Sequence, residues 1–415
     1  MTEPQIRARS LFPRVLEALD DTRIVVIQGA RQVGKSTLAH QVLAERPGRI
    51  VTLDDTEARV FAGEDPVGFL QQNPDGLLVV DEIQRVPELV IALKAAVDRD
   101  QRPGRYLVTG SANLLDLAST HESLAGRAES VVLHSFSQSE LAGQAASFPD
   151  HAFRGHTFGD HSSTLTREDY LARACAGGYP EAMRRSPRRR EDWYDTYLSR
   201  IVNRDAVDIS GLQRLADLPR LLRLIAARSG STMVWNSLAN DSQIPRRTLD
   251  PYVGLLETLY LVHTLPAWSV NLTAREVKQP KLFLLDSGLA ASLLGLSPEA
   301  MGPTHVATGG LMEGFVIGEI RRQLGWSHQR ATMHHYRNSR GSEVDLVLEA
   351  PDGRVVAIEV KAAATVQKKD LTGLTVLREG LGDRFVGGYV LYTGDRSRPM
   401  GDRLTAVPID ALWSV

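Results

Sequence analysis

The stretch IVVIQGARQVGKSTLAHQVLAE, residues 24–45, decides the fold of the first part of the chain. An apolar run typical of a buried strand is followed by GARQVGKST, residues 29–37, and then by a segment with helical periodicity. The middle part fits the pattern G-x-x-x-x-G-K-[ST], in which backbone N–H groups wrap a phosphate and the N-terminus of the next helix adds its dipole. The stretch therefore predicts a phosphate-binding loop between a strand and a helix.

Four further apolar runs follow this loop and are separated by segments of helix length. They span residues 49–53, 77–82, 105–110 and 130–136. Strands that are apolar along their whole length indicate a parallel sheet covered on both faces. We therefore expect a doubly wound α/β domain, which we place at residues 1–150.

The residue types in and after the loop predict a particular chemistry. Lys35 would balance the charge of the β- and γ-phosphates, and the Ser36 hydroxyl would bind Mg²⁺. The run at 77–82 ends in Asp81, which can hold Mg²⁺ through water, and Glu82, which is placed to polarise the attacking water. The alternative is a strand that ends in two solvated carboxylates. The predicted cofactors are thus ATP and Mg²⁺, with Ser36 and Asp81 as metal ligands. The predicted nucleotide-binding residues are Gly29, Ala30, Arg31, Gln32, Val33, Gly34, Lys35, Ser36, Thr37, Asp81 and Ser111.

Further polar residues are expected near the same edge of the sheet. Thr109, Ser111 and Asn113 follow the fourth strand, at the carboxyl edge where ligands bind in such sheets. Arg127 precedes the fifth strand and could act on the nucleotide of a neighbouring subunit in a homo-oligomer, or pair with Glu129 on its own surface. We accordingly predict three catalytic residues, which are Glu82, Lys35 and Arg127.

The composition limits the classes of protein. A chain of 415 residues suits two or three domains, and its formal net charge of -2 gives no chain-wide attraction to nucleic acid or an anionic membrane. The single cysteine, Cys175, excludes an internal disulfide framework and a cysteine-based zinc site. The first residues lack the apolar core of a signal peptide, and no run has the roughly 18 apolar residues of a membrane helix. We expect a cytoplasmic protein.

The middle of the chain, residues 151–270, is predicted to be a linker followed by a helical region. Residues 140–165 read as a loop or linker, because they are rich in Gly, Ser, His and Phe without a sustained period. Farther on, a short helix, a turn and a helix that begins at Arg246 and Arg247 precede the strand-like run LYLVHTL, an order similar to a winged helix-turn-helix. Such a module reads DNA or serves only for packing against a partner.

Several motifs together resemble a known family. They are GARQVGKST, VVDEIQRVPEL, YLVTGSANLL, SLAGR, LDSGLAASLLG, MEGFVIGEI, YRNSRGSEVDLVLE and AIEVKAA, in that order along nearly the whole chain. They resemble the bacterial and archaeal AAA-type ATPases with a C-terminal domain of unknown function, DUF4143. The resemblance implies an AAA+ core, a helical and winged-helix middle, and a restriction-endonuclease-like α/β domain at residues 271–415. Ser111 departs from the family pattern, since typical AAA+ proteins have Asn there.

The C-terminal domain carries a second candidate site. Metal-dependent nucleases use an acid from a helix, an Asp on one strand and Glu-x-Lys on the next. Asp345, Glu359 and Lys361 have that form, and Glu313 or Glu319 on the preceding helix could complete it. Alternation along a strand places Glu359 and Lys361 on one face. The alternatives are a metal site that cleaves, a binding module that has lost cleavage, and a solvated strand face.

Three functions remain open at this point. The first is a Mg²⁺-dependent ATPase that couples its nucleotide state to the C-terminal module. The second is a DNA-processing enzyme in which the C-terminal acids cut, with DNA bound through the winged-helix and C-terminal regions. The third is a nucleotide-gated binding or regulatory switch without nuclease activity and with little turnover.

Overall fold

The computed structural model describes residues 7–111, 124–209, 215–271, 273, 275, 278–302 and 305–415. The chain divides into two compact units. Unit 1 comprises Met1–Phe136 with Thr258–Tyr260, and unit 2 comprises Ser137–Glu257 with Leu261–Val415. None of the helices in the described ranges is long and apolar enough to cross a bilayer.

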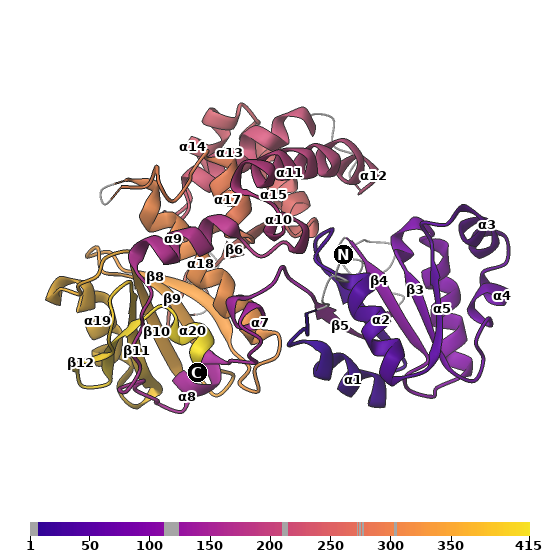
Figure 1. Ribbon diagram of the computed structural model, residues 1–415, viewed down its shortest axis with the longest axis horizontal. Helices are drawn as coiled ribbons and strands as arrows, with labels where there is room; N and C mark the ends of the chain where they lie inside the picture. The colour runs from indigo at the N-terminus through magenta and orange to yellow at the C-terminus, as the bar shows by residue number, and fades with distance from the viewer. Residues whose placement is uncertain are drawn as a thin grey trace. The chain divides into compact units, whose positions relative to one another are not determined.

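Unit 1 is built on a five-stranded parallel sheet with the strand order β2-β3-β4-β1-β5. Figure 1 labels β3, β4 and β5 of this sheet. Its strands are β1 (Ile24–Gln28), β2 (Gly48–Thr52), β3 (Leu77–Asp81), β4 (Tyr106–Gly110) and β5 (Ala128–Val132). Its described helices are α1 (Phe12–Asp21), α2 (Lys35–Glu45), α3 (Thr56–Glu64), α4 (Pro66–Leu70), the 3₁₀ turn η1 (Ile83–Arg85) and α5 (Glu88–Arg99). The predicted parallel sheet is confirmed.

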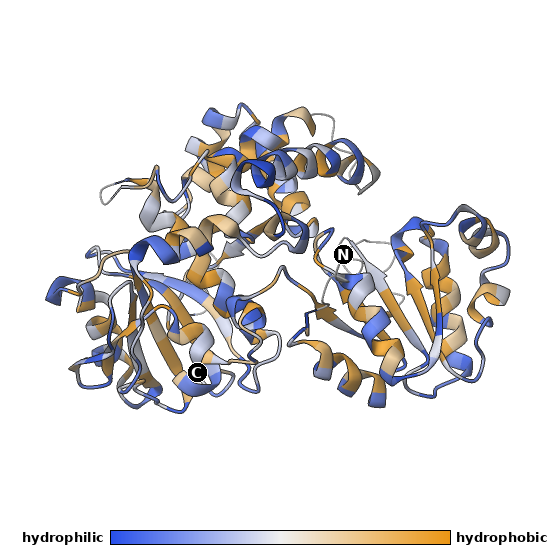
Figure 2. Ribbon diagram, viewed as in Figure 1, coloured by the Kyte–Doolittle hydropathy of each residue, from blue (hydrophilic) through white to orange (hydrophobic). Residues whose placement is uncertain are grey.

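The central strands of unit 1 are buried throughout. β1, β3 and β4 have no exposed residue. Figure 2 shows that the strands of this unit are largely hydrophobic and that the helices around them carry many hydrophilic residues. Val26 and Val80 pack with Phe69 and Leu93 from α4 and α5 in one apolar cluster. Because β4 lies between β1 and β3, the carboxyl ends of these three strands are neighbours. That edge receives the phosphate-binding loop.

Unit 2 contains a six-stranded mixed sheet with the order β12-β13-β11-β10-β9-β8. Its strands are β8 (Thr332–Arg337), β9 (Glu343–Glu349), β10 (Val355–Lys361), β11 (Phe385–Tyr392), β12 (Arg398–Gly401) and β13 (Leu404–Pro408). β10, β11 and β13 run parallel, while β8, β9 and β12 pair antiparallel. Between β10 and β11 the chain crosses over through α19 (Thr372–Leu381), whose Leu374 and Leu377 pack on Val355 and Ala357. Helix α18 (Ala307–Leu324) lies against β10.

The rest of unit 2 is mainly helical. Its elements are α9 (Arg167–Ala176), α10 (Pro180–Met183), α11 (Pro187–Arg200), the π-turn η2 (Ile201–Asp205), α12 (Ala206–Ile209), η3 (Leu215–Asp217), α13 (Leu218–Ala227), α14 (Trp235–Ser242), α15 (Arg246–Thr258), α17 (Ser287–Leu293), and the antiparallel hairpin of β6 (Val262–Leu265) and β7 (Lys281–Leu284). The order α14, turn, α15, β6 agrees with the order expected from the sequence. Its designation as a winged helix stays a prediction.

The segment predicted as a loop or linker, residues 140–165, is instead packed into unit 2. It includes the end of α7 (Gln138–Leu141) and all of α8 (Phe148–Phe153). Phe148 stacks on Phe158 with ring centroids 4.9 Å apart, and both rings meet Tyr389 of the sheet edge-on. The sequence did not indicate this packing, because the segment is rich in Gly and Ser and two widely spaced aromatic residues give no periodic signal. Short elements complete the unit, namely η4 (Lys368–Leu371), η5 (Gly382–Arg384) and α20 (Ala411–Ser414).

Candidate functional site

The predicted phosphate-binding loop follows β1 and leads into α2. At Gly29, φ is 150°, and a Cβ there would lie 2.1 Å from the carbonyl oxygen of Leu133, so only glycine fits. Gly34 has a φ of 100° and caps α2, which begins at Lys35. The orphan N–H groups of the first helical turn therefore lie at the loop, which is the arrangement that binds phosphate.

Lys35 is buried and lies folded against the loop that precedes it. Its Nζ donates to the carbonyl oxygens of Gly29 (3.0 Å) and Ala30 (2.9 Å). Only 4% of the residue is exposed, so the ammonium charge is held inside the loop that would surround a phosphate. A phosphate in the loop would offer this ammonium a charged acceptor in place of the two neutral carbonyls.

Ser36 and Asp81 meet at the edge of the sheet. The Ser36 hydroxyl donates to Asp81, with 2.9 Å to Oδ1 and 3.1 Å to Oδ2. Two threonine hydroxyls from neighbouring strands hold the same carboxylate, Thr109 at 2.6 Å from Oδ1 and Thr52 at 3.3 Å from Oδ2. A hydroxyl beside a carboxylate is the hard oxygen set that Mg²⁺ prefers, so these residues fit the predicted metal.

Glu82 follows Asp81 in a left-handed conformation, with a φ of 60°. Its backbone N–H donates to Thr109 Oγ1 at 3.0 Å, which fixes the turn at the end of β3. Its side chain accepts a hydrogen bond from Gln84 Nε2, and the same amide group donates to Ser111 Oγ at 2.8 Å. Gln84 thus joins the proposed base to the residue that stands where AAA+ proteins have Asn. The sequence interpretation did not give Gln84 or Thr52 a role.

Arg9 supports the loop from behind and was also missed. Its Nη1 donates to the Val33 carbonyl at 3.0 Å and its Nη2 to the His134 carbonyl at 2.5 Å, while the guanidinium lies over Phe136. The signal in the sequence was weak, because Arg9 lies before the first strand among other basic residues. Its buried position shows that it braces the loop.

Arg127 lies apart from this network. Arg127 Nε donates to Asp98 Oδ1 at 2.6 Å, so it pairs with Asp98 and not with Glu129, which lies near Arg14. Asn113 falls outside the described residues.

The C-terminal acids come together in unit 2. Asp345 lies on β9, Glu359 and Lys361 lie on β10, and Glu313 lies on α18. Lys361 Nζ donates to Glu359 Oε1 at 2.7 Å, which agrees with their predicted place on one strand face. The backbone N–H of Val360 donates to Asp345 Oδ2 at 2.9 Å.

A fifth residue, Lys281 of β7, lies among these acids. Its Nζ is 2.7 Å from Glu313 Oε1 and 3.4 Å from Asp345 Oδ1, and only 2% of the residue is exposed. Glu319 points elsewhere, since it accepts from the Gln138 N–H and pairs with Arg322. Of the two helix acids considered from the sequence, Glu313 is therefore the one in the cluster. In the part of the chain that the structure describes, no group of three or more His, Cys, Asp or Glu side chains is arranged to hold a metal ion.

Burial and neighbouring charges raise the pKa values of two acids in this cluster. Burial, and then the charge of Asp345, raise the pKa of Glu313 to about 8, although Lys281 opposes the shift. The same two causes raise the pKa of Glu359 to about 7, opposed by Lys361. The cluster has three carboxyl groups and only two ammonium groups. One proton bound to a carboxyl group therefore makes its net charge zero.

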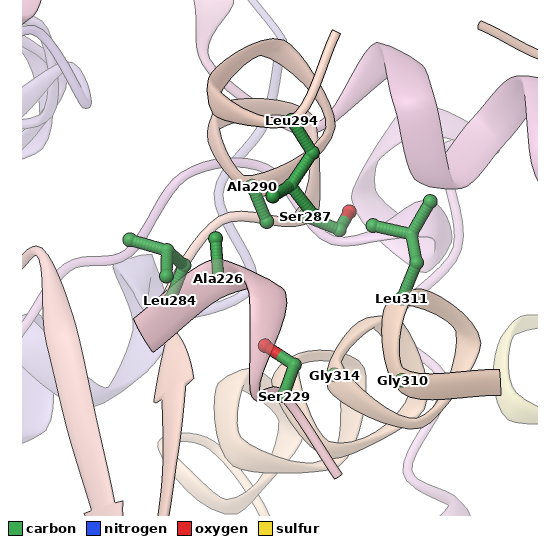
Figure 3. Close-up of a pocket in the computed structure, with 9 residues that line it drawn as sticks. All are labelled: Ala226, Ser229, Leu284, Ser287, Ala290, Leu294, Gly310, Leu311 and Gly314. Atoms are coloured by element: carbon green, nitrogen blue, oxygen red, sulfur yellow. The ribbon is translucent and has the colours of Figure 1, made fainter. Parts of the chain in front are cut away.

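A cavity beside the N-terminal part of α18 is too small to be the ligand site. It has a volume of roughly 10 Å³, which holds about one water molecule. Figure 3 shows that its walls come from α13 and the residues after it, the end of β7, α17 and α18. Gly310 lets α18 approach the chain after α13, because a Cβ there would lie 2.3 Å from the Ser229 carbonyl oxygen. This close packing helps to place Glu313 near β7.

Three stretches of the chain match known protein families. Residues 21–142 match the AAA domain, residues 167–300 a domain of unknown function, DUF8612, and residues 308–412 a domain of unknown function, DUF4143. The first and third matches confirm the resemblance that the motifs indicated.

The chain is similar to two mycobacterial proteins and to two proteins of known structure. The uncharacterized proteins Mb2031c of Mycobacterium bovis and Rv2008c of Mycobacterium tuberculosis are each 28% identical over 419 residues, which cover 98% of this chain and 85% of theirs. A signal transduction ATPase with numerous domains from Pyrococcus horikoshii matches at 10% identity and a TM-score of 0.21, over 77% of this chain and less than half (46%) of its own. A DNA polymerase III gamma subunit-related protein from Thermotoga maritima matches at 13% identity and a TM-score of 0.24, over 60% of this chain and 96% of its own.

Proposed function

The chain combines an AAA domain with a C-terminal DUF4143 domain, and we propose that unit 1 binds ATP with Mg²⁺ and hydrolyses it. The observation that carries this proposal is the contact between Ser36 and Asp81 beside the loop, with Glu82 next along the chain. A strand that merely ended in two solvated acids would not need Asp81 to be held by three hydroxyl groups.

Each residue has a defined part in the proposed reaction. The N–H groups of the loop and of the first turn of α2 bind the phosphates, and the Lys35 ammonium leaves the loop carbonyls to neutralise phosphate charge. Ser36 and Asp81 would hold Mg²⁺, which when bound neutralises charge on the β- and γ-phosphates. Glu82 accepts the proton of the attacking water, and Gln84 orients its carboxylate.

Two substitutions test the proposal. Lys35→Ala should abolish nucleotide binding, whereas Glu82→Gln should bind ATP normally and stop hydrolysis. Glu88→Gln is the matched control, because it makes the same change at an exposed position on α5. Binding is measured with a fluorescent ATP analogue and turnover by phosphate release. Normal turnover in Glu82→Gln would refute the assignment of the base, and negligible turnover in wild type would favour the nucleotide-gated switch.

A second candidate function is DNA contact through α14 and α15. A groove of about 500 Å³ at the start of α15 supports it, because it is lined by side chains that commonly contact DNA. They include Asn236, Asn240, Gln243 and Arg246. Arg246 also pairs with Asp250 and lies over Trp235, so part of its charge is already engaged.

One set of measurements tests both candidate functions, ATP hydrolysis and DNA contact. The ATPase rate of wild type and of Asn240→Ala is compared with and without double-stranded DNA, and DNA binding is followed by fluorescence anisotropy. DNA binding that the substitution weakens, with a rate that DNA stimulates, would support coupling. Equal anisotropy curves for the two proteins would remove DNA contact by α14 and leave the ATPase proposal untouched.

A further inference from the structure

The cluster of Glu313, Asp345, Glu359 and Lys361 has the residue types of a metal-dependent nuclease site, but it already contains a cation. The Lys281 ammonium lies between the helix acid and the strand acid, 2.7 Å from Glu313 and 3.4 Å from Asp345. In such nucleases the metal is bound by acids of this set. A divalent cation that bound the same two oxygens would need the space and the charge that the lysine now fills.

The backbone on either side of Lys281 is fixed, so this lysine is not a mobile surface side chain. Lys281 forms a β-bridge with Thr232, and the Met233 N–H donates to the Pro280 carbonyl at 2.7 Å. On the other side, β7 pairs with β6 along four residues. The strand β7, which places the ammonium beside the acids, is therefore held by backbone pairing on both of its edges.

The packing around Glu313 is equally close. Gly230 has a φ of 83°, and a Cβ there would lie 2.5 Å from Glu313 Oε2. One side of the carboxylate therefore faces the backbone after α13 while the other receives the lysine. Such tight enclosure leaves little room for a hydrated metal.

We propose that the Lys281 ammonium is the resident cation of this cluster and takes the place of the divalent metal that the nuclease-like residues imply. The cluster then joins the β6–β7 hairpin to α18 and β9 as a buried ionic lock, and it does not use a metal ion to cleave nucleic acid. This inference concerns unit 2 alone and does not depend on ATP hydrolysis in unit 1.

The first test needs no change at Lys281. Mn²⁺ is titrated into the nucleotide-free full chain, and binding is followed by the electron paramagnetic resonance signal of free Mn²⁺, for wild type and for Asp345→Asn. We expect the two proteins to bind the same number of Mn²⁺ ions with the same affinity. A site that wild type has and Asp345→Asn lacks would overturn the proposal.

The second test removes the internal cation. Lys281→Ala should create a Mn²⁺ site with an affinity at least about tenfold above the background, and the added substitution Asp345→Asn should abolish it. Lys278→Ala is the matched control, because Lys278 is an exposed lysine three residues earlier. A folded Lys281→Ala protein that gains no Mn²⁺ site would contradict the proposal. Should Lys281→Ala fail to fold, the comparison of wild type with Asp345→Asn still decides.

Discussion

From the raised pKa of Glu313, which lies beside Lys281, we predict that unit 2 loses stability as the pH rises toward about 8. The folded pKa of Glu313, about 8, lies above its unfolded value of 4.5. Between these values the folded protein holds a proton that the unfolded chain has released. The stabilisation is therefore complete below about pH 4.5 and is lost as the pH approaches about 8.

The magnitude follows from the number of protons. One proton linked to folding changes the free energy of unfolding by about 1.4 kcal/mol per pH unit. Because the cluster has one carboxylate in excess of its ammonium groups, we expect a loss of about 2 kcal/mol between about pH 6 and about pH 8. Glu313→Gln removes the titrating group while keeping the shape of the side chain, and should reduce that loss by half or more.

The assay can follow unit 2 by itself, because all five tryptophans of the chain belong to it. They are Trp193, Trp235, Trp268, Trp326 and Trp413. Urea denaturation followed by tryptophan fluorescence, at several pH values, gives the free energy of unfolding of unit 2 for both proteins. Glu319, whose pKa burial raises to about 7, titrates in both and cancels in the difference. Stability that rises with pH in wild type, or equal slopes in the two proteins, would refute the reasoning.

Three predictions concern unit 1. Gln84→Ala should lower kcat about tenfold with the KM for ATP unchanged, because a hydrogen bond to a charged carboxylate is worth about 1.5–3 kcal/mol and here orients Glu82; steady-state kinetics with an unchanged kcat would contradict this role. Arg9→Ala should weaken binding of a fluorescent ATP analogue about tenfold, since the loop loses its brace; unchanged affinity would count against it. Arg127→Ala should be nearly inactive alone but regain turnover when mixed with Lys35→Ala, whose intact arginine would reach the neighbouring nucleotide; activity in the unmixed variant would remove the action in trans.

The nucleotide site could be predicted because its information is local. Lys35 and Ser36 are set by a pattern of eight residues, and Asp81 by its place at the end of an apolar strand. The parallel order of the strands then brings Asp81, and Glu82 directly after it, to the loop without further information. The role of Gln84 could not be predicted, because it depends on the hydrogen bond to Ser111, which forms only when β3 and β4 pair.

The unit 2 cluster could be predicted only in part. Asp345 and Glu359 occupy adjacent strands, so their proximity followed from the hairpin pattern. Lys281 is 32 residues from Glu313 and 64 from Asp345 along the chain, and no periodicity links them. A charged residue at the start of the otherwise apolar strand KLFLL was the one available signal. A lysine at such a position reads equally well as a strand end in solvent.

The buried lysine also gives a rule for reading other sequences with the same acids. Loss of the ammonium leaves two buried carboxylates facing each other, which costs several kcal/mol unless another cation arrives or an acid is lost as well. Substitutions at the positions of Lys281, Glu313 and Asp345 should therefore occur together among related chains. A relative that keeps all three acids and lacks the lysine is the one in which to look for a bound metal and for cleavage. Where the lysine is present, we expect the cluster to connect β7, α18 and β9 and not to catalyse cleavage.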